Sequence, residues 1–337
     1  MSTGLALAGI AAGVVAGAAF EPAAALARGA VQDSSAASAS AGVSAGAPTL
    51  PSLVAYVRGG DIYVSKGPAE KRLTAGGTSA RPRWSPDGKS IAYLKGGLLW
   101  VMKADGSAQR RLTTRAAAGP SWSPDGKWIA FASLSCSGGS GVYRIPSAAG
   151  KTEVLFPRDC RGEALPPEPA PVASRAGSLS ERLSTDDAVA WSPDGAKVAF
   201  RGGDCESVYD SCLSVGTVAD GGEQTLAAYG GGSLQTSGFA VVPSWRPDGA
   251  RLAWTAYQKG ETKADDKPVH LVEYDTKTRA KRVVGGALDR ELAYLDANRA
   301  VATAQYGKGS WVMVVNLATK ARTPFREGSQ PSVQPTR

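Results

Sequence analysis

One short sequence recurs along this chain and constrains its fold more than any other feature. Residues 84–89 read WSPDGK, and residues 122–127 repeat that sequence without a change. Two further copies, WSPDG and WRPDG, begin at Trp191 and Trp245. Each copy is followed by a short apolar run, such as Ile-Ala-Tyr at 91–93. A repeat of this length, built from strand and turn signals, predicts an array of similar β units.

Each residue type of the repeat has a place in a tight turn. Proline presets φ at the second turn position, aspartate tolerates the third, and glycine supplies the positive φ that closes the turn. The flanking apolar runs then form the two arms of a β-hairpin, and the tryptophan fits a buried position between stacked sheets. We therefore interpret the motif as structural rather than catalytic or metal-binding. Its members are Trp84, Pro86, Asp87, Gly88, Trp122, Pro124, Asp125, Gly126, Trp191, Pro193, Asp194, Gly195, Trp245, Pro247, Asp248 and Gly249.

The strand signals divide the chain into units of four strands, A to D. Five complete units fall between residues 81 and 325, and 53–74 supplies strands B, C and D of another unit. The sequence PSVQP at 331–335 matches PSWSP at 120–124, so residues 329–337 are expected to supply the missing strand A. Pairing both ends of the chain in one sheet removes an exposed edge. The prediction is an all-β protein, a six-bladed β-propeller of four-stranded antiparallel blades, closed by pairing of the C-terminal strand with the first blade.

The pattern W-S-P-D-G-x-x-[IV]-A-[FYW] resembles the WD40-like repeat of TolB-type β-propellers, over residues 51–337. This resemblance implies the propeller fold and a role at the cell envelope. The transport function of TolB depends on a separate amino-terminal domain, and residues 28–50 are too short to form one, so that function is not carried over. The same repeat occurs in prolyl-oligopeptidase-type hydrolases, whose α/β-hydrolase domain this chain has no room for.

The amino-terminal residues predict export. Residues 4–20 are almost wholly small and apolar, and Ala-Leu-Ala at 25–27 has the form of a signal-peptidase site. We expect a signal peptide at 1–27, a disordered Ala/Ser/Gly linker at 28–50 and the propeller at 51–337. An uncleaved anchor is the alternative, although the run is shorter than the roughly 20 residues that span a bilayer. The mature protein is then an extracellular, periplasmic or envelope-associated monomer without a membrane span.

Propeller topology assigns the connections to two faces. The A–B and C–D turns share one face, whereas the B–C and D–A connections share the other, where segments 157–187, 202–211, 228–242 and 257–268 fall. Because long loops on a rigid scaffold commonly carry binding sites, we predict ligand contact there. The candidate binding residues are Arg158, Arg161, Asp186, Asp187, Asp204 and Asp210. Proximity along the chain favours disulfides between Cys136 and Cys160 and between Cys205 and Cys212, as expected for an exported chain.

Signals for catalysis are weak. The only histidine, His270, lies in an apolar-rich stretch that reads as a strand, and no Gly-x-Ser-x-Gly elbow is present. Two acidic groups could bind Ca²⁺, but their spacing matches no loop template, so neither metal nor cofactor is predicted; the groups are Asp186 with Asp187, and Asp204 with Glu206 and Asp210. The net charge of +8 is not concentrated in a basic run, which argues against nucleic acid. We predict a non-enzymatic propeller that binds a protein, peptide or envelope polymer. The alternative is a hydrolase or lyase that uses acidic residues near the central channel, with or without Ca²⁺.

Overall fold

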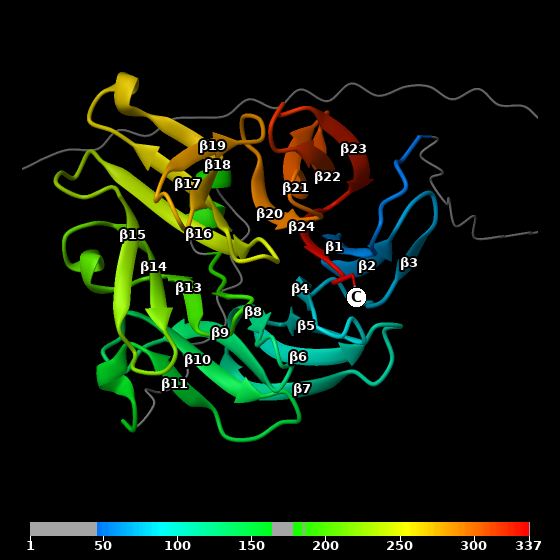
Figure 1. Cartoon of the computed structure of the whole chain (residues 1–337), viewed down its shortest axis with the longest axis horizontal. Coiled ribbons are helices and arrows are strands. Elements are labelled where there is room, and N and C mark those ends of the chain that lie inside the picture. The colour runs from blue at the N-terminus through cyan, green and yellow to red at the C-terminus, as the bar shows by residue number, and fades with distance from the viewer. Residues whose placement is uncertain (1–45, 164–177, 185, 337) are drawn as a thin grey trace, which may run out of the picture. The chain divides into compact units, whose positions relative to one another are not determined.

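Six four-stranded antiparallel sheets form a ring in this computed structural model, which describes residues 46–163, 178–184 and 186–336. Figure 1 shows the sheets arranged around a common axis, and each innermost strand contacts the next. The predicted six-bladed β-propeller is therefore confirmed. The predicted signal peptide and most of the predicted linker lie outside the described residues. No helix within the described ranges is long and apolar enough to cross a membrane.

Each blade runs from its innermost strand A to its outermost strand D. Blade 1 consists of β24 (Ser329–Val333), β1 (Val54–Arg58), β2 (Asp61–Ser65) and β3 (Glu70–Arg72). Blade 2 consists of β4 (Ser79–Trp84), β5 (Ser90–Lys95), β6 (Leu98–Lys103) and β7 (Arg110–Ala116). Blade 3 consists of β8 (Ala118–Trp122), β9 (Trp128–Leu134), β10 (Ser140–Pro146) and β11 (Glu153–Phe156).

The other three blades follow the same order. Blade 4 consists of β12 (Ala190–Trp191), β13 (Lys197–Arg201), β14 (Ser211–Thr217) and β15 (Glu223–Tyr229). Blade 5 consists of β16 (Ser237–Trp245), β17 (Arg251–Lys259), β18 (Lys267–Asp275) and β19 (Lys281–Val284). Blade 6 consists of β20 (Arg290–Tyr294), β21 (Arg299–Tyr306), β22 (Gly309–Asn316) and β23 (Arg322–Glu327). Short helices occur only in connections among the described residues: η1 (Arg158–Cys160), α1 (Leu179–Ser184), η2 (Asp204–Ser207) and η3 (Lys263–Asp265).

The ring closes where the two ends of the described chain pair. β24 runs antiparallel to β1, with Val333 opposite Val54 and Ser332 opposite Ala55. Side chains reinforce this closure, because Glu70 accepts a hydrogen bond from the Tyr56 hydroxyl at 2.5 Å and contacts Arg326 of β23 at 3.7 Å. The predicted contribution of the carboxyl-terminal strand to the first blade is therefore confirmed.

The apolar core lies between the blades. Six clusters of buried side chains each combine residues from two neighbouring blades, so that every blade is packed on both faces. The motif tryptophans sit at these contacts. Trp122 donates its indole N–H to the Arg83 carbonyl at 3.0 Å, and Trp245 donates to the Ala190 carbonyl at 3.1 Å. Each of these indoles therefore joins its own blade to the innermost strand of the preceding blade.

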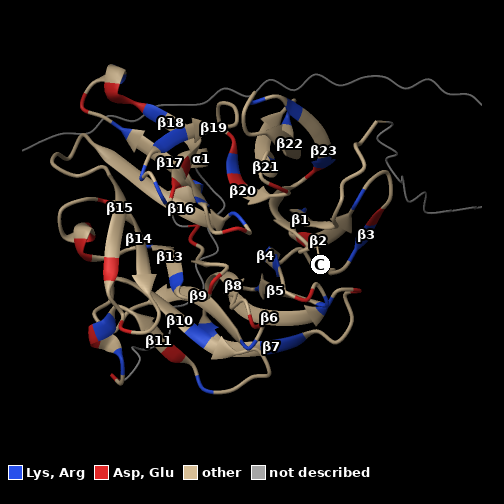
Figure 2. Ribbon diagram, in the orientation of Figure 1, with Lys and Arg blue, Asp and Glu red and all other residues tan. Residues whose placement is uncertain are grey.

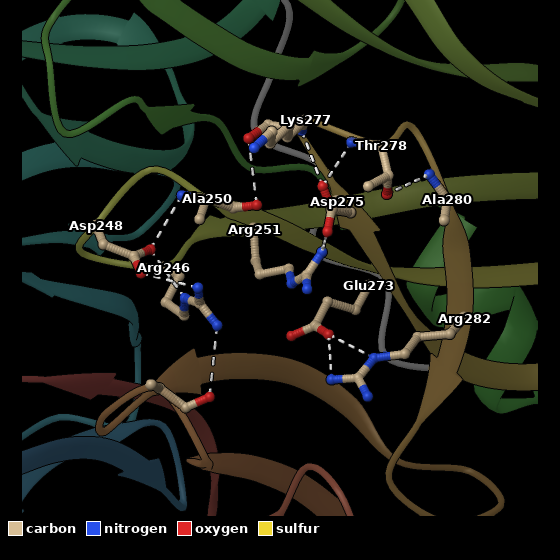
Figure 3. Close-up of polar contacts among 12 residues, drawn as sticks. Arg246, Asp248, Ala250, Arg251, Glu273, Asp275, Lys277, Thr278, Ala280 and Arg282 are labelled. Carbon is tan, nitrogen blue, oxygen red and sulfur yellow. Dashed lines mark hydrogen bonds and ion pairs between the residues drawn. The ribbon is translucent and has the colours of Figure 1, made fainter.

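The motif aspartates hold the A–B turns closed. The Asp87 carboxylate accepts hydrogen bonds from the Ser85 hydroxyl at 2.6 Å and the Lys89 amide at 3.0 Å. Where the fourth copy has arginine in place of serine, Arg246 donates to Asp248 at 2.8 Å instead, as Figure 3 shows. These aspartates therefore have local structural partners. We call the face that carries these turns the Pro-Asp-Gly face and the opposite one the long-loop face.

Two of the predicted loops are shorter than expected. The segments 228–242 and 257–268 were expected to be loops, but β15 continues to Tyr229, β16 begins at Ser237 and β17 extends to Lys259. The extension has a packing cause, because Phe239 and Tyr257 stack across the paired strands with ring centroids 5.3 Å apart. The actual connections are 230–236 and 260–266. The helix α1 lies in the segment 157–187, where only a loop is predicted from the sequence.

Candidate functional site

The long-loop face gathers most of the exposed apolar side chains. Of the seven large hydrophobic residues that are exposed in the described ranges, six lie at or within the B–C and D–A connections. Val208 is 65% exposed and Leu234 is fully exposed. The seventh, Val283, lies on the outer strand β19. The six are Leu134, Val208, Tyr209, Leu234, Leu288 and Tyr306.

Two loops of this face are fixed against each other. The disulfide between Cys205 and Cys212, with Cα atoms 6.2 Å apart, closes the connection that presents Val208. The neighbouring 230–236 connection approaches so closely that a Cβ on Gly231 would lie 2.6 Å from the Val208 carbonyl oxygen. Gly231 also has φ of 82°, which side chains rarely adopt. The exposed apolar groups on these two loops are therefore presented by a braced backbone.

A cavity of about 500 Å³ lies between blades 3 and 4. The β9–β10 and β13–β14 connections both line it, and they contain Cys136 and Cys205 respectively. Its walls are rich in hydroxyl and carboxyl groups, with no basic side chain among the described residues that line it. The lining residues that carry these groups are Ser135, Ser137, Ser140, Ser207, Asp204, Glu206 and Glu223.

Burial changes the acidity of two carboxyl groups in this cavity. Loss of solvation raises the pKa of Glu206, against the effect of the nearby Arg201, whose Nε lies 4.0 Å from Glu206 Oε1. Burial also raises the pKa of Glu223, and the charges of Asp204 and Asp159 add to that shift. An acidic, hydroxyl-lined cavity is suited to ligands that donate hydrogen bonds, such as amines, guanidinium groups and sugars. The described residues contain no group of three or more His, Cys, Asp or Glu side chains placed to hold a metal.

A second charged cluster lies where the innermost strands converge. Arg81 of β4 is 1% exposed and contacts two carboxylates, Glu291 of β20 at 2.9 Å and Asp186 at 3.1 Å. Burial raises the pKa of Asp186, although Arg81 opposes the shift. Burial also acts to raise the pKa of Glu291, but the charges of Arg81 and Arg290 outweigh it and hold that pKa below its usual range. The predicted residue Asp186 is thus a partner in an ion cluster at the axis.

The neighbouring predicted residue, Asp187, has a different environment. It is half-buried, and burial raises its pKa to about 6. The charge of Arg201 opposes the shift, whereas those of Glu206 and Asp186 add to it. Asp187 therefore lies within electrostatic range of both the axial cluster and the acidic cavity.

The other predicted residues are distributed rather than gathered. Arg161 bridges blades 3 and 4, donating to the carbonyls of Leu155 at 2.9 Å and Val218 at 3.3 Å. Arg158 lies beside Gly221, and Asp204 lines the cavity. Asp210 packs against Gly230, next to the braced loops. Binding roles for these residues stay predictions.

The cysteine pairs and the single histidine can also be placed. Cys136 is joined to Cys160 and Cys205 to Cys212, which are the pairs expected from the sequence. His270 lies on β18, where its Nδ1 is 2.7 Å from the Pro268 carbonyl oxygen and burial lowers its pKa. Sequence reasoning missed Arg81, Glu291 and the cavity residue Glu223. Charged residues inside the otherwise buried innermost strands were the available signal for the first two.

Comparison with known proteins places the fold. No family model matches the sequence, and no curated protein matches it. TolB from Acinetobacter baumannii superposes with a TM-score of 0.60 at 15% identity, covering 86% of this chain and 68% of that chain. A putative TolB from Agrobacterium tumefaciens superposes with a TM-score of 0.56 at 15% identity, covering 84% of this chain and 92% of that chain. Hydrazine synthase from Kuenenia stuttgartiensis superposes with a TM-score of 0.55 at 12% identity, covering 86% of this chain and 47% of that chain. In fold, the described part of this chain is a six-bladed β-propeller of the TolB type.

Proposed function

We propose that this chain is an exported, non-enzymatic propeller that binds a protein, peptide or envelope polymer through its long-loop face. The observation that carries the proposal is the concentration of six of seven exposed large apolar residues on that face. Single exposed apolar residues are normal on a soluble protein, but the presence of six of them on one face supports an interaction surface there.

The covalent structure supports both export and binding. Disulfides persist in oxidising compartments and are rare in the cytosol, so two of them fit an exported chain. Both also constrain connections of the long-loop face. A loop that is already held in one conformation loses less entropy on binding, which favours affinity.

The acidic cavity supplies a polar counterpart to the apolar loops. A partner that inserts a basic or hydroxyl-bearing side chain between blades 3 and 4 would meet the carboxyl groups of Asp204, Glu206 and Glu223. The same partner could place apolar groups on Val208 and Leu234 of the neighbouring loops. A basic, partly apolar protein segment is therefore the chemistry that we expect this face to prefer.

The test uses variants of one chemical type at two locations. Val208→Ser with Leu234→Ser removes two exposed apolar groups from the long-loop face, and Val283→Ser removes one from the outer strand as a matched control. Wild type and variants are cross-linked in the native envelope fraction, and captured proteins are identified by mass spectrometry. We expect the control to capture the wild-type partner and the double variant to lose it by at least about tenfold, with similar melting temperatures because surface substitutions change stability little.

Two outcomes would contradict the proposal. Retention of the same partner by the double variant would show that the long-loop face is not the contact surface. Turnover of an ester, lactone or polysaccharide that disappears in Asp187→Asn or Asp204→Asn would favour instead the hydrolase or lyase alternative, which relies on acidic residues near the channel.

A further inference from the structure

The axis carries an unusual side chain close to the Pro-Asp-Gly face. In each innermost strand, one position comes directly before the motif tryptophan, or before the residue that takes its place in blades 1 and 6. This position holds serine or alanine in five blades and arginine in one. The hydroxyl groups of two of them face the next innermost strand, because Ser332 accepts the Trp84 amide at 3.3 Å and Ser121 accepts the Trp191 amide at 2.9 Å. The six residues are Arg83, Ser121, Ala190, Ser244, Ala293 and Ser332.

Arg83 lies two residues along β4 from Arg81, which already forms ion pairs with two carboxylates. Its charge interacts with those of Arg81, Glu291 and Asp186, which come from three different blades and meet at the axis. Arg81 forms ion pairs with both of those carboxylates. Within the described ranges, no carboxylate lies within ion-pair distance of Arg83, and the one hydrogen bond of its side chain goes from Nη1 to the adjacent Pro82 carbonyl at 2.9 Å. A guanidinium group has five N–H donors, so most of its capacity remains unused.

The surroundings make this unpaired cation costly. Burial and the charge of Arg81 lower the pKa of Arg83 to about 10, so it remains protonated at neutral pH. A charge that loses part of its hydration gains from an opposite charge close to it, because the loss is otherwise uncompensated. Arg83 is only half-buried, so an ion from solution can reach it. Figure 2 shows basic and acidic positions gathered where the innermost strands converge.

We propose that Arg83 anchors an anion-binding site on the propeller axis, next to the Pro-Asp-Gly face, that takes an oxyanion group such as a phosphate or a carboxylate. The planar guanidinium fork matches two oxygens of either group. Ser332 lies in the innermost strand beside β4, and its hydroxyl accepts the amide of Trp84, the residue that follows Arg83. The Ser332 hydroxyl donates to no other described residue, so it has a proton available for the anion.

This site is separate from the surface that we propose for partner binding. It lies at the opposite end of the innermost strands from the B–C and D–A connections, and it selects negative rather than positive charge. Failure of one proposal therefore leaves the other intact.

The experiment measures phosphate binding to the folded full chain. Isothermal titration calorimetry with sodium phosphate, at an ionic strength held constant with sodium chloride, compares wild type with Arg83→Gln and Arg83→Lys. Arg144→Gln is the matched control, because Arg144 is a partly exposed arginine that pairs with Glu153 on outer strands. We expect Arg83→Gln to lose phosphate affinity by at least tenfold, Arg83→Lys to lose less, and the control to stay within twofold.

Further arms keep the result interpretable. A titration with N-acetylglycine, compared with one using its neutral amide, tests whether the same residue also binds a carboxylate. If Arg83→Gln does not fold, Ser332→Ala tests the same site and should weaken binding severalfold. Wild type that binds phosphate no better than chloride, or an Arg83→Gln variant that binds as wild type does, would overturn the proposal.

Discussion

Replacing Arg81 by methionine should destabilise the propeller strongly. Arg81 is 1% exposed and lies 2.9 Å from Glu291 and 3.1 Å from Asp186. Removing one partner of a buried ion pair costs about 3–5 kcal/mol, because the remaining charge keeps its desolvation penalty. Arg83 and Arg290 remain nearby and offset part of that penalty, so we expect about 3 kcal/mol at pH 7.5. The strained backbone makes no difference, since φ of 51° is equally unfavourable for both side chains.

The loss should depend on pH. Without Arg81, Asp186 and Glu291 are two enclosed carboxylates that face each other with less positive charge, so their pKa values in the folded state rise above those in the unfolded chain. At a pH between the unfolded-state and the folded-state pKa values of these two carboxyl groups, the folded variant binds more protons than the unfolded chain. The stability of the variant therefore increases as the pH falls through this range. The cost of the substitution should therefore be largest above pH 7 and shrink towards pH 4.

Urea denaturation followed by tryptophan fluorescence at pH 7.5 and 4.5 measures both effects. The triple variant Arg81→Met, Asp186→Asn, Glu291→Gln should regain much of the lost stability, because it leaves no unpaired carboxylate at the axis. The control Glu153→Gln breaks the exposed pair with Arg144 and should cost at most about 1 kcal/mol. A cost below about 1 kcal/mol for Arg81→Met, or an equal cost at both pH values, would refute the electrostatic account.

Three further predictions follow from the same structure. Deleting residues 328–337 removes β24 and leaves β1 as an open edge, so the melting temperature should fall by more than about 5 °C; an unchanged melt would contradict closure. Asp187→Asn should stabilise the protein by about 1–3 kcal/mol at pH 7.5 and by almost nothing near pH 4, because a pKa of about 6 penalises ionisation only above the unfolded pKa. Replacing Cys136 and Cys160 by serine should cost about 2–4 kcal/mol, and a non-reduced peptide map that links Cys136 to Cys205 would contradict the pairing.

Most of the fold could be predicted because the repeat encodes its own local structure. The Pro-Asp-Gly turn fixes a hairpin, and four copies fix the spacing of the blades. The closure was predictable from PSVQP, because β24 occupies in blade 1 the place that the motif strand occupies elsewhere. Loop ends were less predictable. Phe239 and Tyr257 extend β16 and β17 by stacking across the sheet. This contact could not be predicted, because the neighbouring residues are rich in glycine and polar side chains and resemble a loop.

The candidate sites were harder to predict, because they join residues that are distant in sequence. Arg81 and Asp186 are 105 positions apart and pair at the axis. Together with Glu291 they belong to blades 2, 4 and 6 or to the connection before them, so the cluster is assembled from alternate blades. The cavity has the same property, because Ser135 and Glu223 reach it from different blades. Sequence could assign loops to a face, but not side chains to a shared centre.

The regular parts of the repeat and its departures have different physical roles. Where the motif is kept, its polar groups satisfy one another: hydrogen bonds from Ser123 and Ser192 hold the pKa values of Asp125 and Asp194 below their usual range, which leaves those carboxylates committed to the turn. A residue that departs from the pattern has no such partner supplied by the repeat. Arg83 stands where other blades have serine or alanine, and its unused donors are the direct consequence. In a propeller built this regularly, a charged residue at an otherwise small position is therefore a stronger sign of ligand chemistry than the conspicuous repeated aspartates.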